Sequence, residues 1–250
     1  MIKTFKTELK KIKHRHFPLL FAVLTGFLFL WLFATFRGID DAERACGYFS
    51  VLYNFPMINT IILPLFIAVL ASRIWDMEHK GNTLKLLCTL EDRKTIYLNK
   101  SILGGSFLLL FSFVECLLIL AFGRIFGFVQ AIPTTHIVCF FVTTSLTSLL
   151  LYFIQEILSF SFDNQIVALA VGLIGSFVGL FSLYLPRSFS QFVIWSYYSV
   201  LQTVGMNWDV NTRICTYFES PLSLGHLFVT FILLLLAAFA GKIIFERKDI

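Results

Sequence analysis

The sequence predicts an all-α membrane protein with six transmembrane helices, and three observations lead to that fold class. Hydrophobic residues make up 58% of the 250 residues, charged residues make up only 14%, and the mean hydropathy is +0.82. An ordinary soluble domain carries about 25% charged residues, which help to cover its surface. The apolar residues are gathered in continuous runs that do not alternate, which is typical of helices and not of a barrel. These features exclude a secreted disulfide scaffold, a disordered chain and a soluble nucleotide-binding enzyme.

Six apolar runs are predicted to cross the membrane within a single transmembrane domain, residues 1–250. Each run holds roughly 20 residues, enough to span the hydrocarbon at about 1.5 Å of rise per residue. The runs are residues 17–36, 55–72, 101–122, 134–154, 165–185 and 226–245. The first run is longer than the apolar part of a signal peptide and has no small-residue cleavage site after it, so we expect it to be retained.

The basic residues predict which way the helices point. With six spans, 15 of the 20 lysine and arginine residues fall on one side of the membrane and five on the other. Such an excess marks the cytoplasmic side, where anionic lipid headgroups attract basic residues. Both termini are therefore expected to be cytoplasmic, with membrane lipid as a partner. The basic excess has no feature of a nucleic-acid interface.

The N-terminal segment is predicted to be an amphipathic helix that lies on the inner leaflet. Ile2, Phe5, Leu9 and Ile12 recur at helical spacing, and lysines occupy the other faces. The alternative is a simple anchor that only sets the orientation of the first span.

The longest cytoplasmic connection, residues 73–100, is predicted to contain a short coupling helix. Gly81-Asn82 breaks the segment, Thr83 is positioned to cap a following helix, and Leu84, Leu87, Cys88 and Leu90 lie near one face. A helix of this kind is suited to insertion into a groove on a cytoplasmic partner. The alternative is a loop that folds back on its own bundle, and we favour the partner.

The external loop, residues 186–225, is predicted to hold an interfacial or re-entrant helix before the last span. The aromatic residues of residues 189–204 favour the headgroup region, while polar residues interrupt the run and argue against a seventh span. Trp195, Tyr197 and Tyr198 are therefore candidates for contact with a substrate at the outer leaflet.

Glu115 is the clear acidic residue inside a predicted span. An acid at the bilayer centre costs about 2.5–3.5 kcal/mol on insertion scales, which favours a function such as contact with a cationic substrate group or response to protons. The alternative is a protonated Glu115 that hydrogen-bonds to a neighbouring helix. Glu156 and Asp163 are expected to lie at the inner surface, solvated or facing a partner.

No catalytic or metal site is predicted. The five histidines and five cysteines do not follow metal-ligand spacing, and the odd number of cysteines is not a disulfide framework. A bridge between Cys46 and Cys215 stays open. No phosphate-binding loop of the type G-x-x-x-x-G-K-[ST] occurs, so we expect no cofactor bound by this chain.

The coupling segment resembles that of type-2 ABC exporter permeases. The similarity rests on Glu78, Gly81, Thr83, Leu84, Lys85 and Leu87, followed by Arg93, Tyr97 and Lys100, and on Glu8 to Lys13 in the entry helix. Asn82 separates Gly81 from Thr83, which the family often has adjacent. In size and number of spans the chain is most similar to lantibiotic-immunity permeases.

This resemblance implies the permease subunit of an ATP-driven exporter that expels an amphipathic antimicrobial peptide from a bacterial cytoplasmic membrane. ATP and Mg²⁺ would bind to a separate ATPase dimer, which would contact Glu78, Gly81, Thr83, Leu84, Lys85, Leu87 and Arg93. A second permease, identical or homologous, would complete the complex. Two other classes stay open from the residues alone: an ion-coupled secondary transporter that uses Glu115, and a membrane scaffold or sensor.

Overall fold

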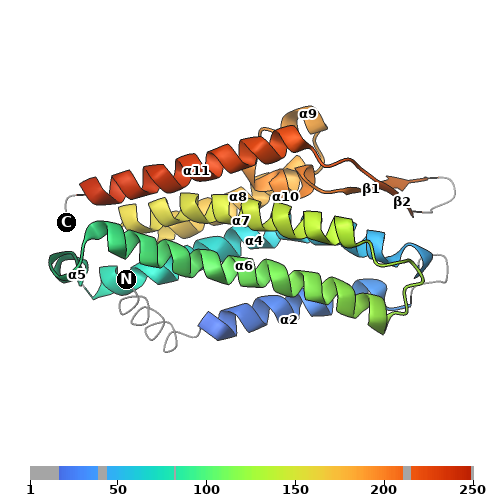
Figure 1. Cartoon of the computed structure of the whole chain (residues 1–250), viewed down its shortest axis with the longest axis horizontal. Coiled ribbons are helices and arrows are strands. Elements are labelled where there is room, and N and C mark those ends of the chain that lie inside the picture. Colours follow the sequence, from blue (N-terminus) through green and yellow to red (C-terminus); the bar gives the residue numbers. More distant parts are fainter. Residues whose placement is uncertain (1–16, 39–43, 82, 211–214, 249–250) are drawn as a thin grey trace.

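The computed structural model describes residues 17–38, 44–81, 83–210 and 215–248 and shows a bundle of long helices with a small hairpin at one end (Figure 1). The elements are α2 (Phe17–Phe36), α4 (Gly47–Lys80), α5 (Leu84–Leu90), α6 (Arg93–Ile125), α7 (Thr134–Ser161), α8 (Ile166–Ser182), α9 (Arg187–Ser190), η1 (Ile194–Ser196), α10 (Tyr197–Val200), β1 (Val204–Trp208), β2 (Cys215–Glu219) and α11 (Leu224–Arg247). The predicted amphipathic helix near the N-terminus lies outside the described residues.

The described helices confirm the membrane-protein class. Five of them, α2, α4, α6, α7 and α11, are long and apolar enough to cross a membrane. A further apolar helix, α8, corresponds to the fifth predicted run but has only 17 residues, or about 25 Å of rise. The first predicted run coincides with α2 at both ends.

Three helices continue well beyond the apolar runs that predicted them. The helix α4 reaches Lys80, α6 already begins at Arg93 and α7 ends only at Ser161. The predicted cytoplasmic connection is therefore shortened to residues 81–92, of which α5 forms most. Hydropathy misses these extensions because the added turns contain polar residues that are buried between helices.

The helix α4 forms the centre of the bundle, and α2 and α11 form its periphery. In their most apolar windows, 72% of α4 is buried, against 22% of α2 and 11% of α11. The helices α7 and α8 pack along α4, α11 packs on α7, and α2 contacts α6. Large exposed side chains such as Leu30, Phe231 and Leu236 therefore present an apolar outer surface, as a lipid-facing helix requires.

Small residues on α8 allow close approach to its neighbours inside the chain. A Cβ atom on Gly172 would lie 2.3 Å from the Ala68 Cβ on α4, and one on Gly175 would lie 2.1 Å from the Trp195 Nε1. Glycine at these two positions therefore serves packing within the bundle.

The external segment differs from the prediction of one interfacial or re-entrant helix. Residues 187–200 form three short pieces, α9, η1 and α10, and the following loop forms the antiparallel hairpin β1–β2 with Val204 opposite Glu219. The segment is broken where Trp195 and Tyr198 turn inward to pack against α4, α7 and α8, while Phe189 and Phe192 stay exposed.

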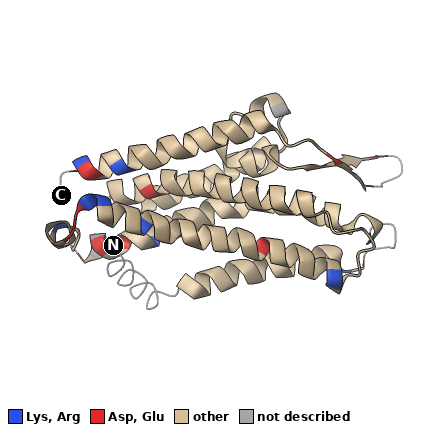
Figure 2. Ribbon diagram, in the orientation of Figure 1, with Lys and Arg blue, Asp and Glu red and all other residues tan. Residues whose placement is uncertain are grey.

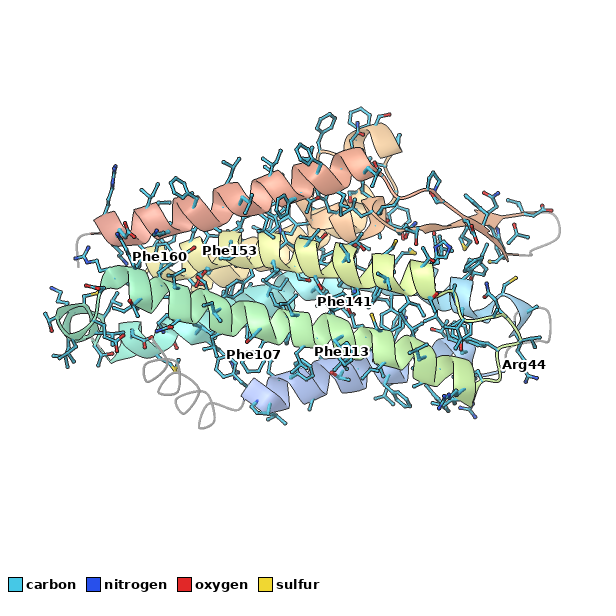
Figure 3. The ribbon with its side chains drawn as sticks, viewed as in Figure 1. Arg44, Phe107, Phe113, Phe141, Phe153 and Phe160 are labelled. Atoms are coloured by element: carbon cyan, nitrogen blue, oxygen red, sulfur yellow. The ribbon has the colours of Figure 1, made fainter. Side chains whose placement is uncertain are left out.

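The two ends of the bundle differ in their content of charged residues (Figure 2). One end carries α5 and the C-terminal end of α11, and most of the coloured bands gather there. The hairpin lies at the opposite end, and the middle of the bundle is almost free of charge apart from an acidic band in α6. Arg44 and Phe160 mark the hairpin end and the α5 end, respectively (Figure 3).

Candidate functional site

The short helix α5 occupies the connection in which the sequence predicts a coupling helix. Gly81 follows the end of α4, and the Thr83 N–H donates to the Glu78 carbonyl at 3.1 Å. The Leu87 N–H then closes the first turn on the Thr83 carbonyl at 2.8 Å. Thr83 stands at the N-cap position, but its hydroxyl makes no capping hydrogen bond. The backbone therefore sets the start of α5, and the predicted side-chain cap is wrong.

The apolar side chains of α5 divide between two faces. Leu84 is buried, and Leu87 and Cys88 pack against the same core, so this face is used inside the chain. Leu86 and Leu90 are 61% and 72% exposed and lie four residues apart, which places them side by side on the outer face. Leu84 and Leu87 therefore anchor α5 within the chain, whereas Leu86, Leu90 and Lys85 are exposed on its outer face, and the predicted contact of the coupling residues with a partner stays a prediction.

An open polar hollow of about 520 Å³ lies beside this outer face. It is lined by Cys88, Thr89, Leu90, Glu91, Asp92, Arg93 and Thr95. Burial raises the pKa of the Cys88 thiol and outweighs the opposing effect of Arg93, so the thiol is kept in its neutral form. The hollow thus combines an apolar rim at Leu90 with carboxylates at Glu91 and Asp92.

Two of the predicted coupling residues hold the base of the connection. Glu78 is buried and forms an ion pair with Lys100 at 2.7 Å, and Lys100 also donates to the Ile74 carbonyl at 2.9 Å. Arg93, at the start of α6, donates to the carbonyls of Glu246 and Lys248 at the end of α11. Glu78 and Arg93 therefore position α5 from behind, whereas Gly81 and Thr83 are exposed.

Glu156 is buried, which overturns the prediction that it lies at a solvated inner surface. Its carboxylate accepts hydrogen bonds from the Ser101 hydroxyl at 2.8 Å, the Trp75 indole at 3.3 Å and the Tyr152 hydroxyl at 3.4 Å. The prediction failed because α7 continues past the end of the apolar run and carries Glu156 between α4 and α6. Asp163 is exposed, as expected.

These side chains form one basal polar cluster at the α5 end, made of Trp75, Glu78, Lys100, Ser101, Tyr152 and Glu156. It joins α4, α6 and α7, and the ring of Phe245 from α11 packs on Trp75 at 5.0 Å. A set of buried hydrogen bonds and ion pairs between helices resists their separation. The sequence pattern did not reveal this cluster; a lysine and two acids close to the ends of neighbouring spans were the available signal.

Glu115 is placed by α6 in the interior of the bundle, as the sequence predicts for a residue within a span. It is fully buried, and within the described part of the chain neither carboxylate oxygen has a hydrogen-bond partner. It lies 15 residues along α6 from Lys100, or about 22 Å, so Glu115 and the basal polar cluster are separate sites.

Of the aromatic residues in the external segment, Trp195, Tyr197 and Tyr198 pack inward, whereas Phe189 and Phe192 are exposed. Trp195 lies against Gly175 of α8, and Tyr198 is buried with its hydroxyl 3.0 Å from that of Ser148. Tyr197 packs with a separate small cluster that includes Leu201. Burial raises the pKa of both phenols, so each remains a neutral hydrogen-bonding group. Tyr198 is near enough to Glu115 for the charge of that carboxyl to act on the phenol.

Cys46 and Cys215 are both exposed free thiols, so this structure contains no disulfide bridge between them. Within the described ranges, no group of three or more histidine, cysteine, aspartate or glutamate side chains is arranged to hold a metal ion.

Comparison with known protein families matches most of the chain. A family model described as ABC-2 family transporter protein matches residues 4–179, more than two thirds of the chain. The matched region contains α5, Glu115 and Glu156, and it ends within α8. No protein of curated function and no solved structure matches the chain significantly.

Proposed function

The chain belongs to the ABC-2 family of transporters and is a membrane permease of that family, and from this premise we propose that it serves an ATP-driven exporter of an amphipathic antimicrobial peptide. A permease of this family is not itself an ATPase, and such permeases generally pair with ATPase subunits. The membership favours this function over the secondary transporter and the scaffold that the residues alone left open.

The observation that carries the proposal is the outer face of α5. Leu86 and Leu90 are exposed at the charged end of a multi-span protein, and the basic excess assigns that end to the cytoplasm. Two neighbouring leucines on a short helix, with Lys85 beside them, suit a groove on a soluble partner. We assign this face to the ATPase dimer, which would supply ATP and Mg²⁺.

The basal polar cluster supports a route for movement from α5 to the spans. Leu84 and Leu87 fasten α5 to the core, and the ion pair of Glu78 with Lys100 joins α4 to α6 directly behind it. Glu156 links the same two helices to α7. Closure of the ATPase dimer would therefore displace the α5 ends of these helices together, while the ends near the hairpin rearrange. A second permease, identical or homologous, would face this bundle across the transport path.

The peptide cargo rests on the similarity of size and span number to lantibiotic-immunity permeases. An amphipathic peptide would reach such a protein from the membrane, where the apolar surfaces of α2 and α11 meet lipid. The proposal assigns the protein to self-protection or resistance in a bacterial cytoplasmic membrane.

The test is a pull-down of the tagged chain from its native membranes in mild detergent, with identification of every co-purifying chain. Wild type is expected to retain an ATPase, and the double variant Leu86→Asp/Leu90→Asp is expected to lose at least about 90% of it, because two buried leucine contacts of about 1.5–3 kcal/mol each are replaced by charges. A second, different permease in the sample would indicate a heteromeric complex.

The matched control is Val210→Asp, an equally exposed apolar residue beyond β1 at the opposite end. It introduces the same charge and is expected to leave the ATPase bound. Absence of an ATPase from wild type in several detergents, or its retention by the double variant, would exclude the assignment of the α5 face.

A further inference from the structure

A second site lies in the middle of the bundle, around the Glu115 carboxyl. Glu115 is fully buried, and among the described residues only the Asn59 amide is close enough to act as a hydrogen-bond donor to it, without forming a well-aligned bond. A buried charge without a partner is strongly unfavourable, and more so inside a membrane where no bulk water reaches it. The carboxyl therefore needs a proton or a cation that the chain itself does not provide.

Two further unpartnered side chains accompany Glu115. Asn59, on α4, is within reach of the carboxyl as a weak hydrogen-bond donor, but neither its amide oxygen nor its amide nitrogen makes a well-aligned hydrogen bond. Ser112 lies three residues before Glu115, on the same face of α6, and its buried hydroxyl is also unpartnered. Most buried polar side-chain atoms in proteins are hydrogen-bonded, so three unsatisfied neighbours indicate a missing ligand.

No basic side chain of the described chain takes that place. The buried lysine, Lys100, is held by Glu78 at the α5 end, about 22 Å away along α6. Tyr198 approaches Glu115 from the external segment, but its hydroxyl is already paired with Ser148. Tyr198 therefore does not neutralise the acid.

The available donor set defines the ligand. Two carboxylate oxygens, one amide oxygen and one hydroxyl are hard oxygen ligands, and they carry a single negative charge. Calcium and magnesium sites use several carboxylates or keep ordered waters, whereas one charge balances one monovalent cation. A primary ammonium group presents the same charge and hydrogen-bonds to the same oxygens.

We propose that Asn59, Ser112 and Glu115 form a membrane-embedded binding site for a monovalent cation, either an alkali ion or a primary ammonium group of the cargo. The alkali-ion form is independent of the proposed function, and the ammonium form rests on it. In the second case the site would recognise the cationic part of an amphipathic substrate midway across the membrane.

The test measures thermal unfolding of the purified full-length chain in detergent. Choline chloride, whose quaternary ammonium is too large and has no N–H donor, is replaced stepwise by NaCl, KCl or n-butylammonium chloride at constant ionic strength. Because a ligand that binds only the folded state stabilises it, one of these small cations is expected to raise the unfolding temperature of wild type saturably. The salt that does so distinguishes an alkali ion from an ammonium group.

Glu115→Gln keeps the size of the side chain and removes its charge, so the cation-dependent rise is expected to disappear. Asn59→Leu is expected to weaken the apparent affinity at least tenfold, while Glu219→Gln, at an exposed acid on β2, leaves it unchanged. Equal unfolding temperatures of wild type in all four salts would overturn the proposal and identify Glu115 as a neutral, protonated acid. The same response in Glu115→Gln as in wild type would also overturn it. The cation titration of wild type tests the proposal even if a variant does not fold. It needs no ATPase, so its result does not depend on the result of the pull-down.

Discussion

Three buried glutamates have different surroundings, and their surroundings assign them different roles. Glu78 is paired with a lysine, Glu156 accepts hydrogen bonds from three side chains, and Glu115 has no partner among the described residues. A partnered acid holds helices together, whereas an unpartnered one is available for a ligand. At the scale of single residues, Glu156 is therefore expected to act on stability and Glu115 on binding.

Replacement of Glu156 by alanine is expected to destabilise the protein by roughly 2–5 kcal/mol, because the donors on Trp75 and Ser101 lose their acceptor in a buried place, while Tyr152 keeps the Lys100 carbonyl. Glu156→Gln keeps one oxygen acceptor and is expected to lose about half as much. Denaturant unfolding in detergent measures both. Glu219→Ala is the control, since that side chain is 70% exposed. If Glu156→Ala were no less stable than Glu219→Ala, the basal polar cluster would not hold the helices together.

Between helices, the close contact of α6 with α7 depends on Gly104. A Cβ atom there would lie 2.1 Å from the Tyr152 ring, whose hydroxyl reaches both Glu156 and the Lys100 carbonyl. The ring cannot move away without breaking these hydrogen bonds. The packing of one glycine thus controls the geometry of the polar cluster behind α5.

Gly104→Ala and Gly26→Ala form a matched pair that isolates this contact. Both replacements gain the same helix propensity, roughly 1 kcal/mol, but a Cβ atom on Gly26 of α2 would meet nothing within 4 Å. Gly104→Ala is expected to be less stable than Gly26→Ala by roughly 2–4 kcal/mol, through overpacking against Tyr152. Thermal unfolding in the same detergent measures the difference. Equal stability of the two variants would show that α6 and α7 can move apart at Gly104 without a cost in stability.

Periodicity and hydropathy were sufficient to locate the apolar helices and the coupling segment, but not their ends or their contact faces. The run 17–36 matched α2 because it is apolar throughout. The ends of α4 and α7 were missed because Glu78 and Glu156 are buried only through partners on other helices. For the same reason the external aromatic residues were assigned to lipid: the sequence does not show that Gly175 provides a space for Trp195. The local sequence pattern shows only how apolar a segment is, whereas the helix ends and the contact faces depend on tertiary contacts.

For the whole molecule, burial and charge separate the surfaces that meet lipid, water and partners. The helices α2 and α11 are largely exposed along their apolar length, so they meet lipid or the second permease. The α5 end collects most of the charge, and the hairpin end carries only a few charged residues (Figure 2). This arrangement predicts that α5 and the hairpin lie on opposite sides of the membrane.

Cysteine labelling in intact cells tests that arrangement, including the passage of the short helix α8 across the membrane. In a background without the five native cysteines, Val210→Cys is expected to react with a membrane-impermeant maleimide from outside. Leu90→Cys is expected to react at least about tenfold less until the membrane is opened, because the excess of basic residues predicts a cytoplasmic location for the α5 end. Both side chains are more than 70% exposed, so differences in burial do not explain the contrast. Labelling of both residues from the same side would mean that the helices between them cross the membrane an even number of times.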